Sequence, residues 1–252
     1  MERSERPVGR SRMLLPLFAA ACSIIAILLL LSSGFGTRLG LWQFRTGFSV
    51  MRFAAYLGLA SSLLAIVSGA ITVRRSQISG MILSLVALLF GLSAFGVPYS
   101  WKLKAQSFPR IHDISTDLDH PPQFVAVVPL RQGLIEYGGV AVAAQQLKAY
   151  PDLKTLLLGM PMEKAFRAAL ETAREMGWQI VAQVPAEGRI EATDTSFWYG
   201  FKDDVVIRIY PAGDRSLVDI RSVSRVGVSD VGVNAKRIRG FLAKISHQPL
   251  PK

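Results

Sequence analysis

MLLPLFAAACSIIAILLLLSSGFG, residues 13–36, is the stretch that sets the architecture of this 252-residue chain, and it contains no charged side chain. About 20 apolar residues, rising 1.5 Å each in a helix, cross a hydrocarbon core of roughly 30 Å. A basic leader before an apolar run also describes a signal peptide. However, this run is long and continues into SSGFGTR without a small-residue cleavage site. We therefore expect an uncleaved membrane anchor.

Two more apolar runs follow, at 53–73 and 78–97, and they complete a predicted three-span membrane domain over 1–97. Only Ser76 and Gln77 separate Arg75 from the third run, which predicts a tight helical hairpin. Small residues recur in both runs. They either allow close helix packing in lipid or reflect ordinary usage in membrane helices. None of the three runs contains Asp, Glu, Lys or His, which argues against an ion path through the helices.

Between the first two runs, residues 37–52 interleave aromatic side chains with arginines. This composition suits the headgroup layer, so we expect a loop lying on the bilayer. A substrate-binding loop is the alternative.

The net charge of +11 comes mostly from arginines that flank the apolar runs. Residues 1–97 hold nine Arg and two acidic residues, whereas residues 98–252 hold 20 Lys and Arg against 16 Asp and Glu. A nucleic-acid-binding protein needs basic residues clustered on a folded surface, so no nucleic-acid partner is expected. The single cysteine, Cys22, excludes an internal disulfide.

The charges that decide orientation are balanced. With the N-terminus inside, six arginines lie on the inner side (3, 6, 10, 12, 74 and 75) and six basic residues on the outer side (Arg38, Arg45, Arg52, Lys102, Lys104 and Arg110). We predict the N-terminus inside because the first helix usually dominates. The remainder of the chain then lies outside the cytoplasm, at a bacterial inner membrane with a periplasmic domain.

The second half of the chain predicts an α+β domain. Pro109, Pro121, Pro122 and Pro129 make 98–135 an extended linker and turn segment, and 136–252 forms the domain. Helices are expected at 140–149 and 161–176, and a last one from the N-cap residue Asn234 to 246. Strands are expected at 178–184, 189–195, 197–201, 204–210 and 217–226, giving an antiparallel sheet with flanking helices.

Two motifs in this half are distinctive: DDVVIRI at 203–209 and VDIRSVSRVGVSDVGVNAKRI at 218–238. Together with HDISTDLDHPPQF at 112–124 and YPD at 150–152, they resemble the domain of unknown function 1499 family over most of 110–246. The three-span leader resembles the membrane-anchored members. The resemblance implies no activity, because the family name records none.

Two groups of residues invite a chemical interpretation. His112, Asp113, Asp117, Asp119 and His120 place metal-ligating atoms within nine residues. The spacing matches no metal motif, so a structured turn is preferred and no metal or other cofactor is predicted. Ser222, Ser224 and Ser229 lack the base and the G-x-S-x-G elbow that a serine nucleophile requires.

The preferred candidate surface is the charged face of the strand pair 204–210 and 218–226. Because side chains alternate on a strand, Arg208 should share a face with Asp219, Arg221 and Arg225. The chain then reaches a helix start, where free backbone N–H groups attract anions. The predicted ligand-binding residues are Arg208, Asp219, Arg221, Arg225, Asp230, Asn234 and Arg237. The alternative is that aspartates neutralise these arginines in a fixed network.

Three function classes remain open, and in one of them the membrane part recognises lipid while the domain only regulates it. The preferred one is a non-catalytic binding or assembly domain, held at the lipid bilayer and contacting envelope proteins or an anionic ligand. The rival is an envelope enzyme that acts on a phosphate- or carboxylate-bearing substrate through Asp and Arg residues of the sheet. Carboxylates with separated pKa values in one cleft would favour the enzyme.

Overall fold

The computed structural model describes residues 13–131 and 135–247. The basic leader (Arg3, Arg6, Arg10 and Arg12) lies outside them. Backbone packing divides the chain into two compact units, Met1–Lys104 with Trp198–Gly200, and Ala105–Phe197 with Phe201–Lys252.

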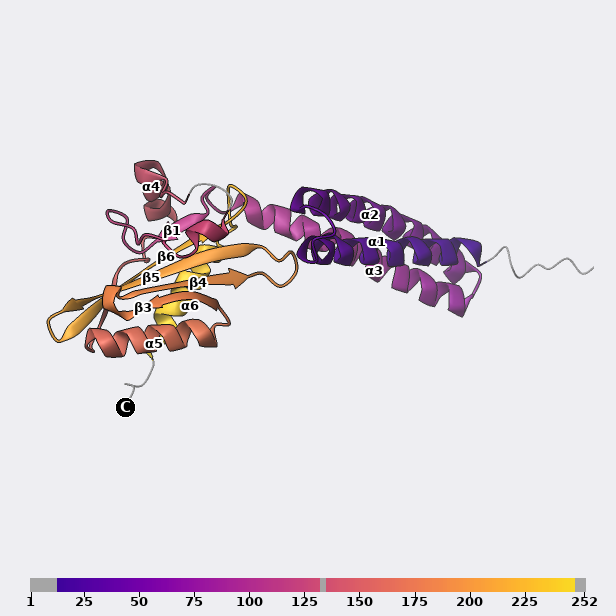
Figure 1. Cartoon of the computed structure of the whole chain (residues 1–252). Coiled ribbons are helices and arrows are strands. Elements are labelled where there is room, and N and C mark those ends of the chain that lie inside the picture. The colour runs from indigo at the N-terminus through magenta and orange to yellow at the C-terminus, as the bar shows by residue number, and fades with distance from the viewer. Residues whose placement is uncertain (1–12, 132–134, 248–252) are drawn as a thin grey trace, which may run out of the picture. The chain divides into compact units, whose positions relative to one another are not determined.

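The first unit consists of three long helices that lie side by side (Figure 1). They are α1 (Leu14–Arg38), α2 (Phe44–Arg74) and α3 (Ile78–Gln106). Each is long and apolar enough to cross a membrane, as predicted. The turn between α2 and α3 is as tight as expected, with Ser76 at a positive φ of 53°.

Two of the expected boundaries are wrong. Residues 44–52 are the first turns of α2 rather than part of a surface loop. Helix α3 does not stop at Pro98 but continues to Gln106, and Trp101, Lys102 and Lys104 lie on it. A proline in a helix removes one backbone hydrogen bond, and membrane helices tolerate that loss.

Small residues bring α2 and α3 close together. A Cβ atom on Gly91 would lie 2.7 Å from the carbonyl oxygen of Gly58, and one on Gly58 would lie 2.7 Å from that of Gly91. The hydroxyl oxygens of Ser68 and Ser84 are 2.8 Å apart. The glycines therefore serve close packing, which is a main source of helix association in lipid.

The second unit is built on one antiparallel sheet with the order β1-β6-β5-β4-β3, in which β2 also pairs with β6. The strands are β1 (Asp113–Ser115), β2 (Leu156–Leu158), β3 (Gln179–Val184), β4 (Arg189–Thr195), β5 (Lys202–Ala212) and β6 (Arg215–Ser224). The helices are α4 (Gly139–Ala149), α5 (Met162–Glu175) and α6 (Val233–Ser246), with short 3-10 turns at Val128–Leu130 and Pro185–Glu187. This is the predicted α+β class.

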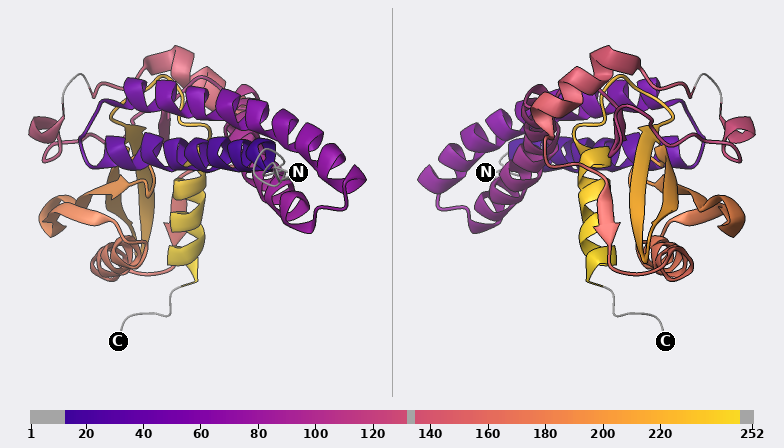
Figure 2. Two further views of the ribbon diagram at one scale, coloured as in Figure 1. Left: turned by 90° about the vertical axis from the view of Figure 1, so that its right-hand side faces the viewer. Right: turned by 90° about the vertical axis from the view of Figure 1, so that its left-hand side faces the viewer.

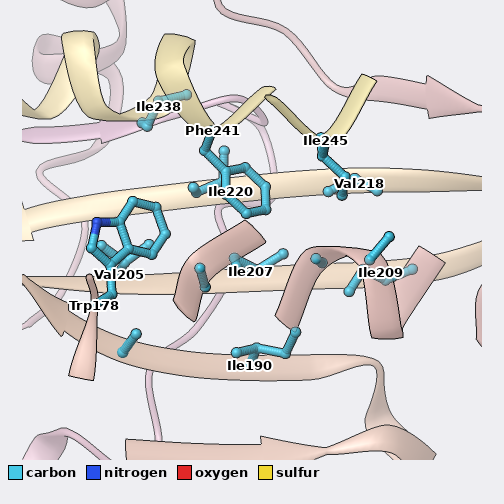
Figure 3. Close-up of a cluster of buried hydrophobic side chains, with 14 of the residues drawn as sticks. Trp178, Ile190, Val205, Ile207, Ile209, Val218, Ile220, Ile238, Phe241 and Ile245 are labelled. Atoms are coloured by element: carbon cyan, nitrogen blue, oxygen red, sulfur yellow. The ribbon is translucent and has the colours of Figure 1, made fainter. Parts of the chain in front are cut away.

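Helices α5 and α6 cover one face of the sheet (Figures 1 and 2). Alternate residues of the long strands point into the core between the sheet and these two helices, including Val205, Ile207 and Ile220 (Figure 3). Gly177 ends α5 at a φ of 77°, which allows Trp178 to turn back into the core. Its ring stacks on Phe241 of α6 at 5.6 Å. The helix face of the sheet therefore holds the domain together.

Three further expectations are corrected. Residues 197–199 form the turn between β4 and β5 rather than a strand. The segment expected as a linker contributes β1, and Phe124 and Val127 pack on the second face of the sheet. The first residue of α6 is Val233, with Gly232 at its N-cap position. Strands β1 and β2 have three residues each, too few to show an alternating pattern.

Candidate functional site

The face of the sheet opposite α5 and α6 carries several buried or partly buried ion pairs, among them Arg208–Asp219 and Arg221–Asp113. In the register of β5 and β6, Arg208 stands opposite Asp219 and Val206 opposite Arg221. Since Val205 and Ile207 face the helices, the alternating residues face the other way. The predicted grouping of Arg208, Asp219 and Arg221 on one face is confirmed by this register.

Arg208 is the centre of the most open part of this face. Its guanidinium donates to Asp219 Oδ2 at 2.7 Å, to Asp117 Oδ2 at 2.8 Å and to the carbonyl of His120 at 2.9 Å. The Asp219 side chain is fully buried, whereas 31% of the Arg208 side chain is exposed. The pair thus runs from the interior of the domain to solvent.

Two threonines complete the environment of Asp219. Its Oδ1 accepts hydrogen bonds from Thr116 Oγ1 at 2.9 Å and from Thr155 Oγ1 at 2.6 Å. Both carboxylate oxygens are therefore satisfied, as a buried charge requires. Thr116 follows β1 and Thr155 precedes β2, so the two short strands on β6 position these hydroxyls.

Two open hollows flank the ion pair. The first has a volume of about 330 Å³, and its lining combines leucines, a proline, threonines and charged residues: Thr116, Asp117, Leu118, Asp119, Leu147, Pro151, Leu153, Lys154 and Thr155. The second, of about 370 Å³, is lined by Glu187, Arg208, Ile209 and Tyr210. Asp117 lines the first hollow and Arg208 the second, so their ion pair joins the two.

The charges at this site are fixed by their surroundings. Burial acts to raise the pKa of Asp117, but hydrogen bonds from the His120 N–H and from Arg208 outweigh it and lower the pKa. Burial acts to lower the pKa of Arg208, and its two carboxylate partners raise it instead. Burial and the negative charge of Asp219 raise the pKa of Tyr210. At neutral pH the site holds an ionised Asp117 and a charged Arg208.

Arg221, by contrast, is completely enclosed. It makes a bidentate pair with Asp113, at 2.9 and 2.8 Å, and lies between the rings of Phe124 and Tyr137. Its remaining N–H groups donate to the carbonyls of Pro122 and Ile135. Burial, with Asp113 nearby, raises the pKa of Tyr137 to about 12. A ligand could reach Arg221 only if the segment covering it moved away.

Arg225 also belongs to an internal network. It donates twice to Asp204, at 2.9 and 2.8 Å, and that fully buried carboxylate also accepts from Arg131 and Thr193. Burial acts to raise the pKa of Asp204, and these donors lower it. Asp204 therefore ties β5 to the segment that crosses the second face.

The start of α6 is already occupied by a carboxylate. Asp230 accepts the N–H groups of Gly232, at 2.9 Å, and of Asn234, at 2.7 Å. Burial raises the pKa of Asp230. The Asn234 side chain bonds Ser222, Ser224 and the carbonyl of His112 instead of capping the helix. The expected anion site at this helix start is thus filled by the chain itself.

Arg237 lies one turn further along α6 and is also paired. It donates to Asp194 and Asp203, at distances of 2.7 to 2.9 Å, and contacts Asn234. The predicted binding residues therefore divide into separate groups. Arg208 and Asp219 come together at a hollow, Arg221 and Arg225 lie in internal pairs, and Asp230, Asn234 and Arg237 organise the start of α6.

The His112–His120 segment forms a turn rather than a metal cage. Asp117 Oδ1 accepts the N–H groups of Asp119 and His120, and Asp113 is held by Arg221. Within residues 13–131 and 135–247, no cluster of three or more His, Cys, Asp or Glu side chains has the geometry to hold a metal ion.

Several residues of the site were not predicted as binding residues. No local sequence pattern identifies Thr155 or Leu147 as site residues. They line the first hollow only because short elements from different parts of the chain pack together there. Gln146 is another case. Its amide accepts the N–H of Ser115 at 3.0 Å and donates to the carbonyl of Ser115 at 2.6 Å. These are the two hydrogen bonds that the backbone of a neighbouring strand would make with β1.

Comparison with known proteins gives one family. The model of a family described as "Protein of unknown function (DUF1499)" matches residues 113–245, which is more than half of the chain and covers the whole sheet. No curated protein matches the chain.

Proposed function

The chain belongs to the DUF1499 family of proteins of unknown function, and we infer that it is a membrane-tethered binding protein rather than an enzyme. Its three helices are long and apolar enough to cross a lipid bilayer, which supports tethering to a membrane. The observation that carries the proposal is the first hollow, where a fixed ion pair and two threonine hydroxyls adjoin an apolar rim of leucines. Such a mixture of apolar surface and a few placed polar groups is typical of binding sites.

The charges of the first hollow favour a partner that carries a basic group. Asp117 and Asp119 line it against a single cation, Lys154. The arginines expected to attract an anion are paired with carboxylates in the described residues: Arg208, Arg221, Arg225 and Arg237. The proposed partner is thus an envelope protein that presents an apolar residue beside a lysine or arginine, rather than a small anion.

An enzyme is less well supported. Catalysis by carboxylates usually needs two of them with pKa values shifted apart in one cleft. The pKa of Asp117 is lowered and that of Asp230 is raised, but Asp230 lines neither hollow and caps α6. Asp117 is held ionised by the His120 N–H and by Arg208, which suits recognition of charge better than proton transfer.

The proposed location is a bacterial inner membrane, with the sheet domain in the periplasm. The support is the arginine-rich N-terminal flank of the first span, which favours an inside N-terminus. Three spans then carry the domain to the outer side.

A photo-crosslinking amino acid placed at Leu147 of the full chain in cells tests the proposal. Leu147 is exposed and lines the first hollow, whereas Arg167 on α5 is exposed and lines neither hollow, which makes it the control position. We expect a protein adduct at Leu147 but not at Arg167. Adding Asp119→Lys should abolish the adduct and Lys154→Gln should preserve it. Equal adducts at both positions, or an adduct unaffected by Asp119→Lys, would contradict the proposal.

A further inference from the structure

The loop between β6 and α6, together with the first residue of α6, exposes apolar side chains within a short span. Val226, Val228 and Val233 are all exposed, Val228 to 62%. We call residues 226–233 the valine loop. Single exposed apolar residues are ordinary, but three exposed valines within eight residues are a local concentration that needs an explanation.

The valine loop is held in a fixed shape. Val231 has a φ of 54°, which is strained for a β-branched residue, and the glycines on either side, Gly227 and Gly232, also have positive φ. The carboxylate of Asp230 binds two N–H groups within the loop and at the helix start. Such strain persists only where surrounding contacts impose it, and it often marks a functional segment. The valines are therefore displayed by a preformed loop.

The segment that anchors the loop follows directly after the third membrane helix. Ser229 Oγ donates to the carbonyl of Pro109 at 3.2 Å, and the Asp230 N–H donates to the carbonyl of Ile111 at 3.3 Å. Phe108 packs against Gly232 so closely that a Cβ there would lie 2.3 Å from its ring. Phe108 is only two residues beyond Gln106, the last residue of α3.

The end of α3 has the composition of a membrane–water boundary. Tyr99 and Trp101 precede Lys102 and Lys104, and aromatic residues with flanking lysines suit the headgroup layer. The five helical steps from Trp101 to Gln106 advance about 7.5 Å along the helix axis. The headgroup region on each side is about 5–8 Å thick, so the anchor of the valine loop begins close to the bilayer surface. Arg110, beside the anchor, is exposed and can face lipid phosphates.

We propose that the valine loop inserts into the interfacial layer of the lipid bilayer and forms a second attachment of the sheet domain to the membrane. The partner is the lipid surface itself. The short covalent path to a spanning helix keeps the loop near lipid, and the side chains that the loop exposes are valines. Its polar residues, Ser229 and Asp230, are only partly exposed and are held in hydrogen bonds. A loop fixed by Asp230 and by the 108–111 segment loses little conformational freedom when it inserts.

The test uses the full chain with Cys22→Ser, in which a single new cysteine carries an environment-sensitive fluorophore. Val228→Cys is the test position, Val226→Cys repeats it within the loop, and Asp214→Cys in the exposed β5–β6 turn is the control. Each protein is reconstituted into phosphatidylcholine–phosphatidylglycerol vesicles, with or without a lipid that carries a nitroxide near its headgroup.

We expect the spin-labelled lipid to cause a large loss of emission from positions 228 and 226 and little loss from position 214. Equal loss at all three positions, or none at 228 and 226, would overturn the proposal. Emission at 228 that depends on the protein-to-lipid ratio but not on the nitroxide would show that a second copy of the chain covers the loop, and would overturn it as well.

Discussion

Arg208 of β5 and Asp219 of β6 stand directly opposite each other in the antiparallel register, and their side chains are joined at 2.7 Å. The same guanidinium holds Asp117, 91 residues earlier in the chain, at the edge of the first hollow. One arginine therefore satisfies a buried carboxylate and positions a partly exposed one.

Replacing Arg208 tests how much its pairing with the buried Asp219 stabilises the domain. Arg208→Ala leaves Asp219 buried without its cation, and removal of one partner from a buried pair costs about 3–5 kcal/mol. We expect the lower end, because 31% of the Arg208 side chain is exposed. Arg208→Lys should be intermediate, since an ammonium cannot reproduce the planar contacts to Asp219, Asp117 and the His120 carbonyl. Thermal unfolding of the purified full chain measures this, and an Arg208→Ala protein as stable as the wild type would contradict it.

Replacing both Arg221 and Arg225 with alanine should destabilise the domain strongly. Arg221 is fully buried, so its removal alone should cost about 3–5 kcal/mol of unfolding free energy. The matched control is Arg239→Ala, because Arg239 pairs with Asp152 at the surface, where ion pairs are worth about 1 kcal/mol or less. A double variant that unfolds like the wild type but loses function in cells would instead identify this face as a ligand site.

The Asp204 network predicts a specific pH dependence. The folded-state pKa of Asp204 lies below its usual value, so its ionised form stabilises the fold. This contribution is present above the unfolded pKa of about 3.9 and is lost as the pH falls through the folded value. Asp204→Asn should therefore be much less stable than the wild type at pH 7, and the difference should shrink at acidic pH. Denaturation at a series of pH values measures it; a constant difference would contradict the assignment.

The orientation can be tested with a reporter that is active only outside the cytoplasm. The reporter should be active when fused after Lys252 and inactive when fused after Gln77, because an odd number of spans separates the inside N-terminus from the domain. The reverse pattern would overturn the orientation and leave the three spans unchanged.

Elemental analysis of the purified protein should find no stoichiometric divalent metal. Asp113 is engaged by Arg221, and Asp117 by Arg208 and by two backbone N–H groups, so neither carboxylate is open to a cation. About one zinc or manganese ion per chain, lost on His112→Ala, would show that the segment rearranges to bind metal.

The sequence by itself determined the features that depend on local patterns. Uninterrupted apolar runs identified the three membrane helices, because crossing lipid requires a minimum length of apolar helix. Alternation along 203–209 and 218–224 placed Arg208, Asp219 and Arg221 on one face, because strand side chains alternate whatever their surroundings. Gly177 and Trp178 marked the end of α5 through a local backbone requirement.

The tertiary structure alone decided which charges meet. Arg221 pairs with Asp113, 108 positions away, and Asp219 bonds Thr116 and Thr155, which adjoin the ends of two different short strands. No periodic pattern encodes such pairs, because they form only when the 113–131 segment folds over the second face of the sheet. In that packing Arg221 and Arg225, which were expected to bind a ligand, form internal ion pairs with aspartates instead. It leaves Arg208, at the edge of the covering segment, beside the two open hollows.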